Sequence, residues 1–573
     1  MKIPSNLQDK ERFVKYVVDT CMASEQERRS LYEKRRRYFL YGQNADTKVK
    51  FNRLKAHIKL VASFLFSPDG LQYNVAPPRN ADEGTIQKML ALQDDWNEDV
   101  HDSGLGDVFA EAVTWAVNYD TMIIKLGWND TKGHLFGRLI EPCNFGFWRE
   151  DDPDFDSQQA MNHKYALDWD EACARLERAG KKDKIALLQN AQAPSENGLP
   201  PALTNIIVSA VTGGGLAGGY AGGTGTVTGS GQPDYEAGPL FTARLTQPMV
   251  EFNETWIWDE DMEDYRIFHS IADGTILSDS VETVDAVNKA AKEKGGNPKY
   301  SSKSNWFLER HNPFIPVTPF TLYNYAWGDC HLEDLIPLQN WSEERLTWIE
   351  EVLQAQVDPE RIGHGITGLI EEKMGLGEGT YYGDESPAGK MEYDRPPMPP
   401  DLFKEFSEIG GLMMETSMLT EITAGKGSGG ARGGQQQKQM QITGGGGIRK
   451  VAIGLEGALV RMGDIGLRLK MKNDDSEIKL PDGSTFYPSQ VEDDFSIHVD
   501  GHSHSPLFLL ENRELAAMLF KAQAIDRQWL IRMTNPTQRQ NLLHSLIQRE
   551  AAEQKAKQEQ MQQEALKHAE KKK

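Results

Sequence analysis

Two stretches, LIPLQNWSEERLTWIEEVLQAQV (335–357) and LFKEFSEIGGLMMETSMLTEI (402–422), decide the fold of this 573-residue chain. Each predicts a long amphipathic helix, because apolar residues recur at helical spacing. The apolar positions are Leu338, Trp341, Leu346, Ile349 and Leu353 in the first stretch, and Leu402, Phe403, Phe406, Ile409, Met413, Leu419 and Ile422 in the second. Asp401 stands where the N-cap of the second helix is expected. At about 1.5 Å per residue, that helix would be about 30 Å long.

The segments that join and follow these helices differ from them in composition. Residues 359–400 are rich in Gly and Pro and predict short strands. Residues 425–447 are rich in Gly and Gln and predict a flexible loop. A third long helix is expected at 448–471, followed by a small β unit to about residue 499 and a helical C-terminus from residue 511 onward.

The chain before residue 335 predicts a mixture of helices and strands. Helices are expected at 8–40, 51–66, 85–100, 105–118 and 168–193. A strand is expected at 121–128, and further strands are expected between there and residue 148. More strands are expected across 240–327, where aromatic residues recur. The glycine-rich stretch 213–231 cannot bury a core and is expected to be a flexible loop.

Length and composition bound the class of protein. A chain of this length is expected to fold as several subdomains. Its net charge of −22 argues against binding nucleic acid by neutralising phosphates, which requires clustered Lys and Arg. The charge fits either a soluble protein kept apart from its neighbours or a surface past which DNA slides, and charge alone does not separate the two.

The cysteines and the hydropathy indicate the compartment. The chain has four scattered cysteines, without a CxxC pair, at Cys21, Cys143, Cys173 and Cys330. They suggest reduced thiols in a cytoplasmic setting rather than disulfides or a zinc site. The start, MKIPSNLQDKERF, lacks the apolar region of a secretory signal. No apolar run reaches the roughly 18 residues of a membrane helix, so no membrane span is expected.

Catalytic motifs are weak. Gly425-Lys426-Gly427 fails as a P-loop, because Thr420 replaces the first Gly and Gly427 replaces Ser or Thr. The GxGxxG-like spacings of 213–231 are interpreted as chance, because no strand leads in and no helix leads out. A nucleophile elbow and an HExxH pair are also missing. The sequence therefore predicts neither an enzyme nor a cofactor or metal site.

Four charged features allow two interpretations each. The basic run 34–37 suits a nucleic-acid contact, but a solvated helix face or an intersubunit salt bridge is favoured. The acidic run 258–264 suits a carboxylate-rich catalytic or Ca²⁺ site, but an acidic turn between strands is favoured. His502 and His504 are interpreted as surface residues rather than ligands. Lys404 would either face a channel or be solvated, and the solvated position is favoured.

The order of these segments resembles that of the bacteriophage portal (head-to-tail connector) family. Two long helices flank a compact insert, and a Gly/Gln-rich loop, a third helix, a β unit and a polar helical C-terminus follow. The phrases that carry the resemblance are NRLKAHIKLVASFLFSPDGLQYNV (52–75), FAEAVTWAVNYDTMIIKLGW (109–128), NYAWGDCHLEDLIPLQNWSEERL (324–346) and FSIHVDGHSHSPLFLLENRELAAMLFKA (495–522). The order covers most of the chain, whereas 213–231 departs from the family pattern.

The resemblance implies an α+β fold with several subdomains. These are an α/β wing, a two-helix stem, a small α/β clip and a helical crown. The implied divisions are a wing at 1–334 with the insertion 213–231, a stem helix at 335–358, a clip at 359–400, a second stem helix at 401–424, a tunnel loop at 425–447, a wing helix and β unit at 448–506, and a crown with a polar tail at 507–573.

The resemblance also implies a function. Portal subunits form a ring, typically of twelve, at one capsid vertex, through which double-stranded DNA is packaged and ejected without sequence specificity. The implied partners are further copies of the chain, the terminase large subunit, tail or adaptor proteins, and the major capsid and scaffolding proteins. The implied location is the virion, or the host cytoplasm during assembly, and no membrane is involved.

Residue roles follow from the resemblance as hypotheses. Residues expected to line the channel near DNA are Lys404, Lys426, Arg432 and Lys438. Residues of the clip expected to contact terminase or an adaptor are Tyr381, Tyr382, Lys390, Tyr393 and Arg395. Two alternatives stay open: a carbohydrate-active hydrolase built on the aromatic and acidic region 240–330, and another structural protein of the neck or head.

Overall fold

The computed structural model has a mixed helix-and-sheet fold. It describes residues 1–42, 51–68, 71–129, 132–178, 182–188, 249–293, 307–357, 360–364, 380–382, 390–394, 400–417, 446–480, 484–499 and 506–534, with four positions between 542 and 549. The predicted glycine-rich segments 213–231 and 425–447 lie largely or wholly outside these ranges. In the described part, no helix has both the length and the apolar character that crossing a membrane requires.

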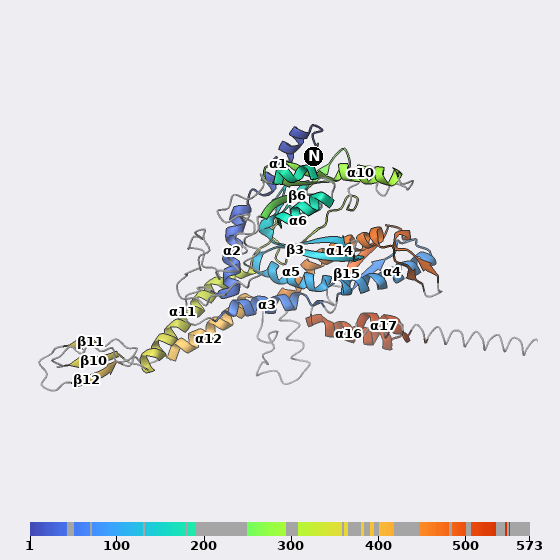
Figure 1. Cartoon of the computed structure of the whole chain (residues 1–573). Helices are drawn as coiled ribbons and strands as arrows, with labels where there is room; N and C mark the ends of the chain where they lie inside the picture. Colours follow the sequence, from blue (N-terminus) through green and yellow to red (C-terminus); the bar gives the residue numbers. More distant parts are fainter. Residues whose placement is uncertain are drawn as a thin grey trace, which may run out of the picture.

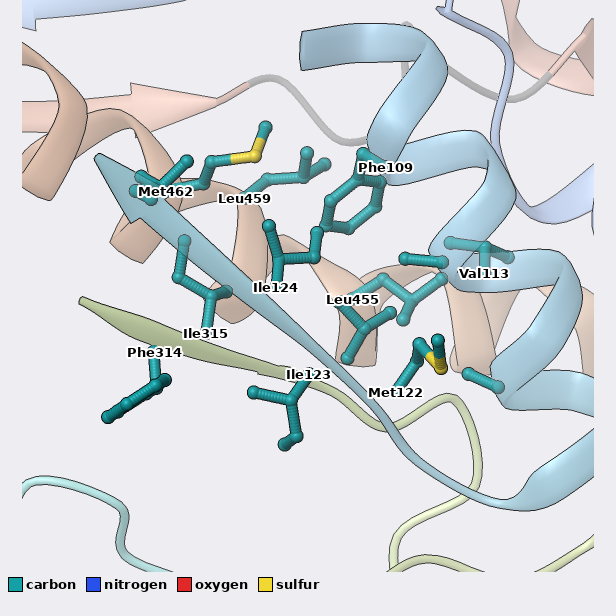
Figure 2. Close-up of a cluster of buried hydrophobic side chains, with 14 of the residues drawn as sticks. Phe109, Val113, Met122, Ile123, Ile124, Phe314, Ile315, Leu455, Leu459 and Met462 are labelled. Atoms are coloured by element: carbon teal, nitrogen blue, oxygen red, sulfur yellow. The ribbon is translucent and has the colours of Figure 1, made fainter. Parts of the chain in front are cut away.

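The centre of the body is a three-stranded antiparallel sheet with the order β3-β2-β9. Its strands are β2 (Met122–Asn129), β3 (His134–Ile140) and β9 (Phe314–Val317). The helices α5 (Leu105–Tyr119) and α14 (Gly446–Asn473) cover one face. Figure 2 shows Ile124 of β2 beside Phe109 of α5 and Leu459 of α14, with Phe314 on the opposite side of the sheet. The β-branched residues Ile123 and Ile124 suit this buried strand.

A second sheet has five antiparallel strands in the order β4-β5-β6-β7-β8. The strands are β4 (Phe145–Phe147), β5 (Ala160–Asp168), β6 (Met249–Asp259), β7 (Asp264–Ile271) and β8 (Ile276–Asp279). The helices that pack on it are α1 (Leu7–Cys21), α6 (Trp169–Arg178) and α10 (Ser280–Glu293). A short helix, α7 (Ile185–Leu188), follows α6.

An aromatic core joins the two sheets. The ring of Phe314 on β9 lies 4.8 Å from that of Phe145 on β4 and 5.8 Å from that of Trp256 on β6, centroid to centroid. Trp256 is fully buried, and Trp258 packs edge-on against Tyr265. Such edge-to-face contacts are favoured by the ring quadrupole. Phe145 is fully buried in this core, and Trp258 is partly buried against it.

Shorter elements complete the body. These are the helices α2 (Glu25–Tyr41), α3 (Arg53–Leu65) and α4 (Glu83–Asp102), the paired strands β1 (Tyr73–Ala76) and β15 (Ser496–Val499), the small hairpin of β13 (Ile478–Lys479) and β14 (Thr485–Phe486), and the helices α16 (Pro506–Lys521) and α17 (Arg527–Thr534). In Figure 1, α16 and α17 lie beside each other below α3 and α4.

A helical hairpin projects from this body (Figure 1). The helix α11 (His331–Val357) runs outward, and α12 (Pro400–Thr416) returns beside it. The far end carries a three-stranded sheet with the order β11-β10-β12, formed by β10 (Glu360–His364), β11 (Thr380–Tyr382) and β12 (Lys390–Asp394). The prediction of two long helices around a short-stranded insert is therefore confirmed.

Some sequence predictions need correction. The single helix predicted at 8–40 is two helices, because the chain turns at 22–24. The helix α11 begins at His331, four residues before its predicted start at Leu335. Asp401 lies in the first turn of α12 rather than at its N-cap, because Pro400, whose fixed φ suits a first helical position, already belongs to the helix. The helix α10 was not predicted within the region assigned to strands.

Candidate functional site: the projecting hairpin and its root

One charged contact and an apolar seam join the two helices of the hairpin. Nη2 of Arg345 on α11 donates to Oε1 of Glu405 on α12 at 3.1 Å, and Nε of Arg345 lies 2.9 Å from Oε2. The guanidinium also lies 4.1 Å from the ring centroid of Trp348, a cation–π arrangement. Ile349 of α11 and Ile409 and Met413 of α12 are also buried. The fork of Arg345 therefore matches the planar carboxylate of Glu405, which stays partly exposed to water.

The outer surface of the hairpin is both acidic and apolar. Acidic residues in α11 and α12 outnumber basic ones by ten to two. Large exposed apolar side chains on these helices are Trp348, Leu353, Val357, Phe403 and Leu412, and Val357 is 85% exposed. A group of exposed apolar side chains on a protruding element is typical of a protein–protein contact surface.

The predicted channel residue Lys404 lies on this surface. Its side chain is 75% exposed, and Nζ lies 3.7 Å from Oε1 of Glu408, one helical turn further along α12. The ammonium is thus partly compensated within its own helix, so that a row of Lys404 side chains would offer DNA little net positive charge. Lys426, Arg432 and Lys438 lie outside the described residues.

The predicted clip residues come together at the tip of the hairpin. Tyr381 and Tyr382 belong to β11, which pairs in parallel with β10. Lys390 and Tyr393 belong to β12, which pairs with β10 from the other side in antiparallel register. Four of the five residues therefore belong to one small sheet, as their assignment to a common clip requires. Arg395 lies outside the described residues.

The root of the hairpin on its α3 side is held by uncharged and cationic groups. The side-chain amide of Gln339 on α11 donates through Nε2 to the carbonyl of Phe51 at 2.9 Å and accepts through Oε1 from the backbone N–H of Leu54 at 3.2 Å. Nη1 of Arg53 donates to the carbonyl of Phe406 on α12 at 3.2 Å, and burial lowers the pKa of Arg53. Both helices of the hairpin are thus fixed to the start of α3.

The other side of the root holds a buried charged network. Nη1 of Arg35 on α2 lies 2.7 Å from Oδ2 of Asp120, which follows α5, and Nε of Arg35 donates to Oε1 of Glu333 on α11 at 3.2 Å. The hydroxyl of Tyr32 donates to the carboxylate of Asp120 at 3.1 Å. Burial raises the pKa of Asp120 to about 7, although Arg35 and Tyr32 favour its ionised form.

This network corrects the interpretation of the basic run 34–37. Both interpretations assumed that these side chains reach outward, but Arg35 is buried and pairs within its own chain. Arg36 lies 3.6 Å from Glu141, and Lys34 lies 3.7 Å from Glu333, also within the chain. Arg35 therefore attaches α2 to the body, whereas Lys34 and Arg37 are exposed, as the favoured interpretation of a solvated helix face requires. A pattern of consecutive Lys and Arg carries no signal of this role, because the partner carboxylates are distant in sequence.

The acidic run 258–264 is confirmed as a turn between strands. Asp259 ends β6, Asp264 begins β7, and the two residues face each other in the register of the pair. The carboxylates of this turn pair with cations of the same chain: Nη2 of Arg310 lies 3.1 Å from Glu263, and Nη1 of Arg266 on β7 lies 3.6 Å from Oδ2 of Asp259. His502 and His504 lie outside the described residues.

Sequence analysis missed a buried polar cluster between the sheets. Glu254 of β6 contacts the ammonium of Lys125 on β2, accepts from Nε1 of Trp256 at 2.9 Å, and has the rings of His163 and His269 at 3.9 Å. Burial raises the pKa of Glu254, but the Lys125 ammonium and the two neighbouring imidazoles outweigh it and hold the pKa well below its ordinary value. The cluster is a compensated ion pair, and its members are too far apart in sequence to form a motif.

Three carboxylates lie close enough together to hold a metal ion. They belong to Asp95 and Asp99 on α4 and to Asp474, which follows α14, and their ligand atoms lie within 4.8 Å of one another. The ammonium of Lys470 already contacts all three: Nζ is 2.8 Å from Asp95, 2.7 Å from Asp474, and within contact of Asp99. The group therefore serves as the counter-charge of a buried lysine.

No protein-family model matches this chain, and a search of curated proteins found no match.

Proposed function

We propose that the chain is a portal subunit, which assembles into a ring through which double-stranded DNA passes during packaging and ejection. The observation that supports this most is the projecting hairpin, in which two long helices leave an α/β body and carry a small sheet at their far end. This arrangement corresponds to the stem and clip that the sequence resemblance implies. Such a projecting element leaves exposed surface that neighbouring copies of the chain would cover in a ring.

The surface chemistry of the hairpin suits this role. Exposed apolar side chains on α11 and α12 are available to pack against a neighbouring hairpin. The excess of acidic residues would repel phosphates weakly along a channel, which favours passage over binding. Lys404, paired with Glu408, does not reverse that charge.

The remaining parts of the proposal follow from the resemblance. The ring, typically of twelve subunits, would occupy one capsid vertex among the major capsid and scaffolding proteins. The clip residues at the tip, Tyr381, Tyr382, Lys390 and Tyr393, would contact the terminase large subunit and later tail or adaptor proteins. ATP hydrolysis would be supplied by terminase, and this chain would act as a structural conduit in the virion.

The carbohydrate-active alternative gains no support from the described part of 240–330. A sugar-binding platform needs exposed aromatic rings, but Trp256 is fully buried in the core between the sheets. A glycosidase acid needs a carboxyl that keeps its proton near neutral pH, whereas the pKa of Glu254 is held low by its cationic neighbours. Another structural protein of the neck or head would equally need no catalytic motif, and a ring with a central channel favours the portal.

Electron microscopy and native mass spectrometry of the purified full chain test the proposal. The expected result is a closed ring with a central channel that admits duplex DNA. Trp348→Asp is expected to reduce ring formation, whereas Ile86→Asp on α4, which removes a similarly exposed apolar side chain from the body, is the matched control. A chain that stays monomeric at high concentration, or a ring that is lost equally in both variants, would contradict the proposal.

A further inference from the structure

Asp120 has a backbone conformation that an L-amino acid rarely adopts. It follows α5 directly, with φ of 136° and ψ of −44°. Only glycine populates this region readily, because a Cβ atom crowds the backbone there. A side chain held in such a conformation must be over-determined by its surroundings, and strain of this kind is concentrated at functional positions.

The surroundings of Asp120 supply that constraint through its carboxylate. Nη1 of Arg35 approaches Oδ2 to 2.7 Å, and the Tyr32 hydroxyl lies 3.1 Å from both carboxylate oxygens. Both donors come from α2, one helical turn apart, so that α2 holds the carboxylate of Asp120 through two side chains. The same Nη1 also donates to the carbonyl of Tyr119, the last residue of α5.

Arg35 also connects Asp120 to the hairpin. Its Nε donates at 3.2 Å to Glu333, which lies in the first turn of α11. One guanidinium therefore contacts the end of α5, the strained residue after it, and the first turn of the projecting helix. Because the guanidinium is planar and presents its donors in a fixed fork, it transmits the position of Asp120 to Glu333.

The chain that leads into α11 is attached to the same segment by close backbone packing. A Cβ atom on Gly328 would lie 2.8 Å from the carbonyl oxygen of Asp120, so these two backbones are in direct contact. The backbone N–H of Gly328 donates to Oγ1 of Thr121 at 3.0 Å. The thiol of Cys330 donates to the carbonyl of Asn118 at 3.0 Å. Residues 118–121 thus fix the place from which α11 starts.

We propose that Arg35 and Asp120 form a joint that sets the orientation of the α11–α12 hairpin relative to the body, with Asp120 as the positioning residue. The conformation of Asp120 fixes the backbone against which the entry to α11 packs, and Arg35 ties the first turn of α11 to that backbone. The inference concerns a single chain and does not depend on ring formation, so the failure of the ring test leaves it standing.

At this joint, desolvation and the hydrogen-bond donors act on the pKa of Asp120 in opposite directions. Desolvation raises the pKa of Asp120 to about 7 against the influence of its donors. The titratable and charged groups that interact with Asp120 are Tyr32 and Arg35 on α2 and Tyr325 and Cys330 before α11, and Glu333 on α11 contacts Arg35. Most of these groups are buried or half-buried, so the charge on Asp120 is weakly screened.

The test combines distance measurement with hydrogen exchange on the full chain. Spin labels at Asp102→Cys on α4 and Glu351→Cys on α11, in a Cys173→Ala background, report the angle of the hairpin, and dilution with unlabelled chain removes distances between subunits. Asp120→Asn and Asp120→Gly both remove the carboxylate, and Asp120→Gly also relieves the backbone strain. Both are expected to shift or broaden the distance distribution and to accelerate amide exchange at the start of α11 about tenfold or more.

The matched control is Asp279→Asn. Asp279 is also buried and paired with an arginine, since Nε of Arg266 donates to it at 2.9 Å, but it lies on β8 of the five-stranded sheet. This variant is expected to leave the distance and the exchange of α11 unchanged. If both Asp120 variants fail to fold, Glu333→Gln decides, because that carboxylate is partly exposed and the chain is expected to fold without it. An unchanged hairpin in Asp120→Gly or Glu333→Gln, or an equal change in Asp279→Asn, overturns the proposal.

Discussion

Replacing Lys470 by Met is expected to destabilise the protein and to create a cation site that the natural chain lacks. The side chain of Lys470 is 2% exposed, and its ammonium contacts Asp95 and Asp99 on α4 and Asp474 beyond the end of α14. Burial lowers the pKa of Lys470, but the three carboxylates outweigh burial and raise it above its ordinary value. The ammonium is therefore charged at all moderate pH values and joins α4 to α14.

The expected loss can be worked from the exposure of the partners. Removing one member of a buried ion pair costs about 3–5 kcal/mol, because the remaining charge is left without compensation. Asp95 and Asp99 keep about a third of their side-chain surface in water, so hydration and screening reduce the cost to about 2–3 kcal/mol. Met preserves the apolar contacts of the lysine stem, so packing contributes little to the difference.

The three carboxylates that remain would then suit a hard divalent cation. Their ligand atoms lie within 4.8 Å of one another, and Ca²⁺ prefers carboxylate oxygens and tolerates irregular geometry. With a dissociation constant of about 1 mM, 10 mM Ca²⁺ would return about 1.4 kcal/mol to the variant by mass action. The natural chain should gain nothing, because its ammonium occupies the centre of the group.

Thermal unfolding with and without Ca²⁺, at matched ionic strength, measures both effects. The variant Lys470→Met should unfold several degrees below the natural chain and recover part of that difference in Ca²⁺, and adding Asp99→Asn should abolish the recovery. The control Lys404→Met removes an exposed lysine and should change neither quantity. A Lys470→Met protein as stable as the natural chain, or one indifferent to Ca²⁺, would refute the account of this cluster.

Three further outcomes are expected. Arg345→Met should destabilise the hairpin by about 1 kcal/mol or less, because the pair of Arg345 with Glu405 is partly hydrated. Arg345→Lys should recover little of that stability, because Lys lacks the planar guanidinium that stacks on Trp348. Amide exchange in α12 measures both effects. The stability of the natural chain relative to Asp120→Asn should fall as pH rises from about 4 to 7, because a carboxyl whose folded pKa is raised to about 7 favours folding only while protonated. The full fall in the free energy of unfolding corresponds to about 4 kcal/mol. Denaturant unfolding of both proteins at each pH measures it. Ring formation should strengthen when salt rises from about 10 mM to 150 mM, because screening weakens repulsion between acidic hairpins, and light scattering that shows rings dissociating over this range would contradict it.

The parts of the fold that the sequence predicted are those with local signals. The helix α3 carries its N-cap three residues from the backbone group it satisfies, since Oδ1 of Asn52 accepts from the N–H of Lys55 at 2.8 Å. The helices α5 and α14 and the two helices of the hairpin were predicted from apolar periodicity, which is a property of each segment alone. The helix α10 follows β8 directly, and its apolar residues Val281, Val284 and Ala291 recur at helical spacing, but the sequence prediction assigned the whole aromatic region to strands.

The turn between α1 and α2 shows why boundaries inside charged segments are hard to predict. Residues 22–24 carry neither Gly nor Pro, and the local signal for a break is the weak one of Ser24, the N-cap residue of α2, three residues before Glu27. The break is imposed by packing, because Gly146 of β4 approaches the backbone of Cys21 so closely that a Cβ atom could not be placed there. Tertiary contact therefore decides where α1 stops, and helix propensity does not.

The same distinction separates the hairpin from its root. The helices of the hairpin could be predicted because the signal for a helix lies within one continuous segment of sequence. The contacts of the root join distant residues: Arg35 is 85 residues from Asp120 and 298 residues from Glu333. A buried arginine and an exposed one look alike in a basic run, because burial depends on whether distant carboxylates arrive to compensate the charge. If the hairpin acts by standing at a fixed angle beside its neighbours, that angle depends on residues at the root that the sequence pattern could not identify. The exposed tip can vary with its partner, but the root must hold one geometry, and that requirement accounts for a strained aspartate where glycine would fit more easily.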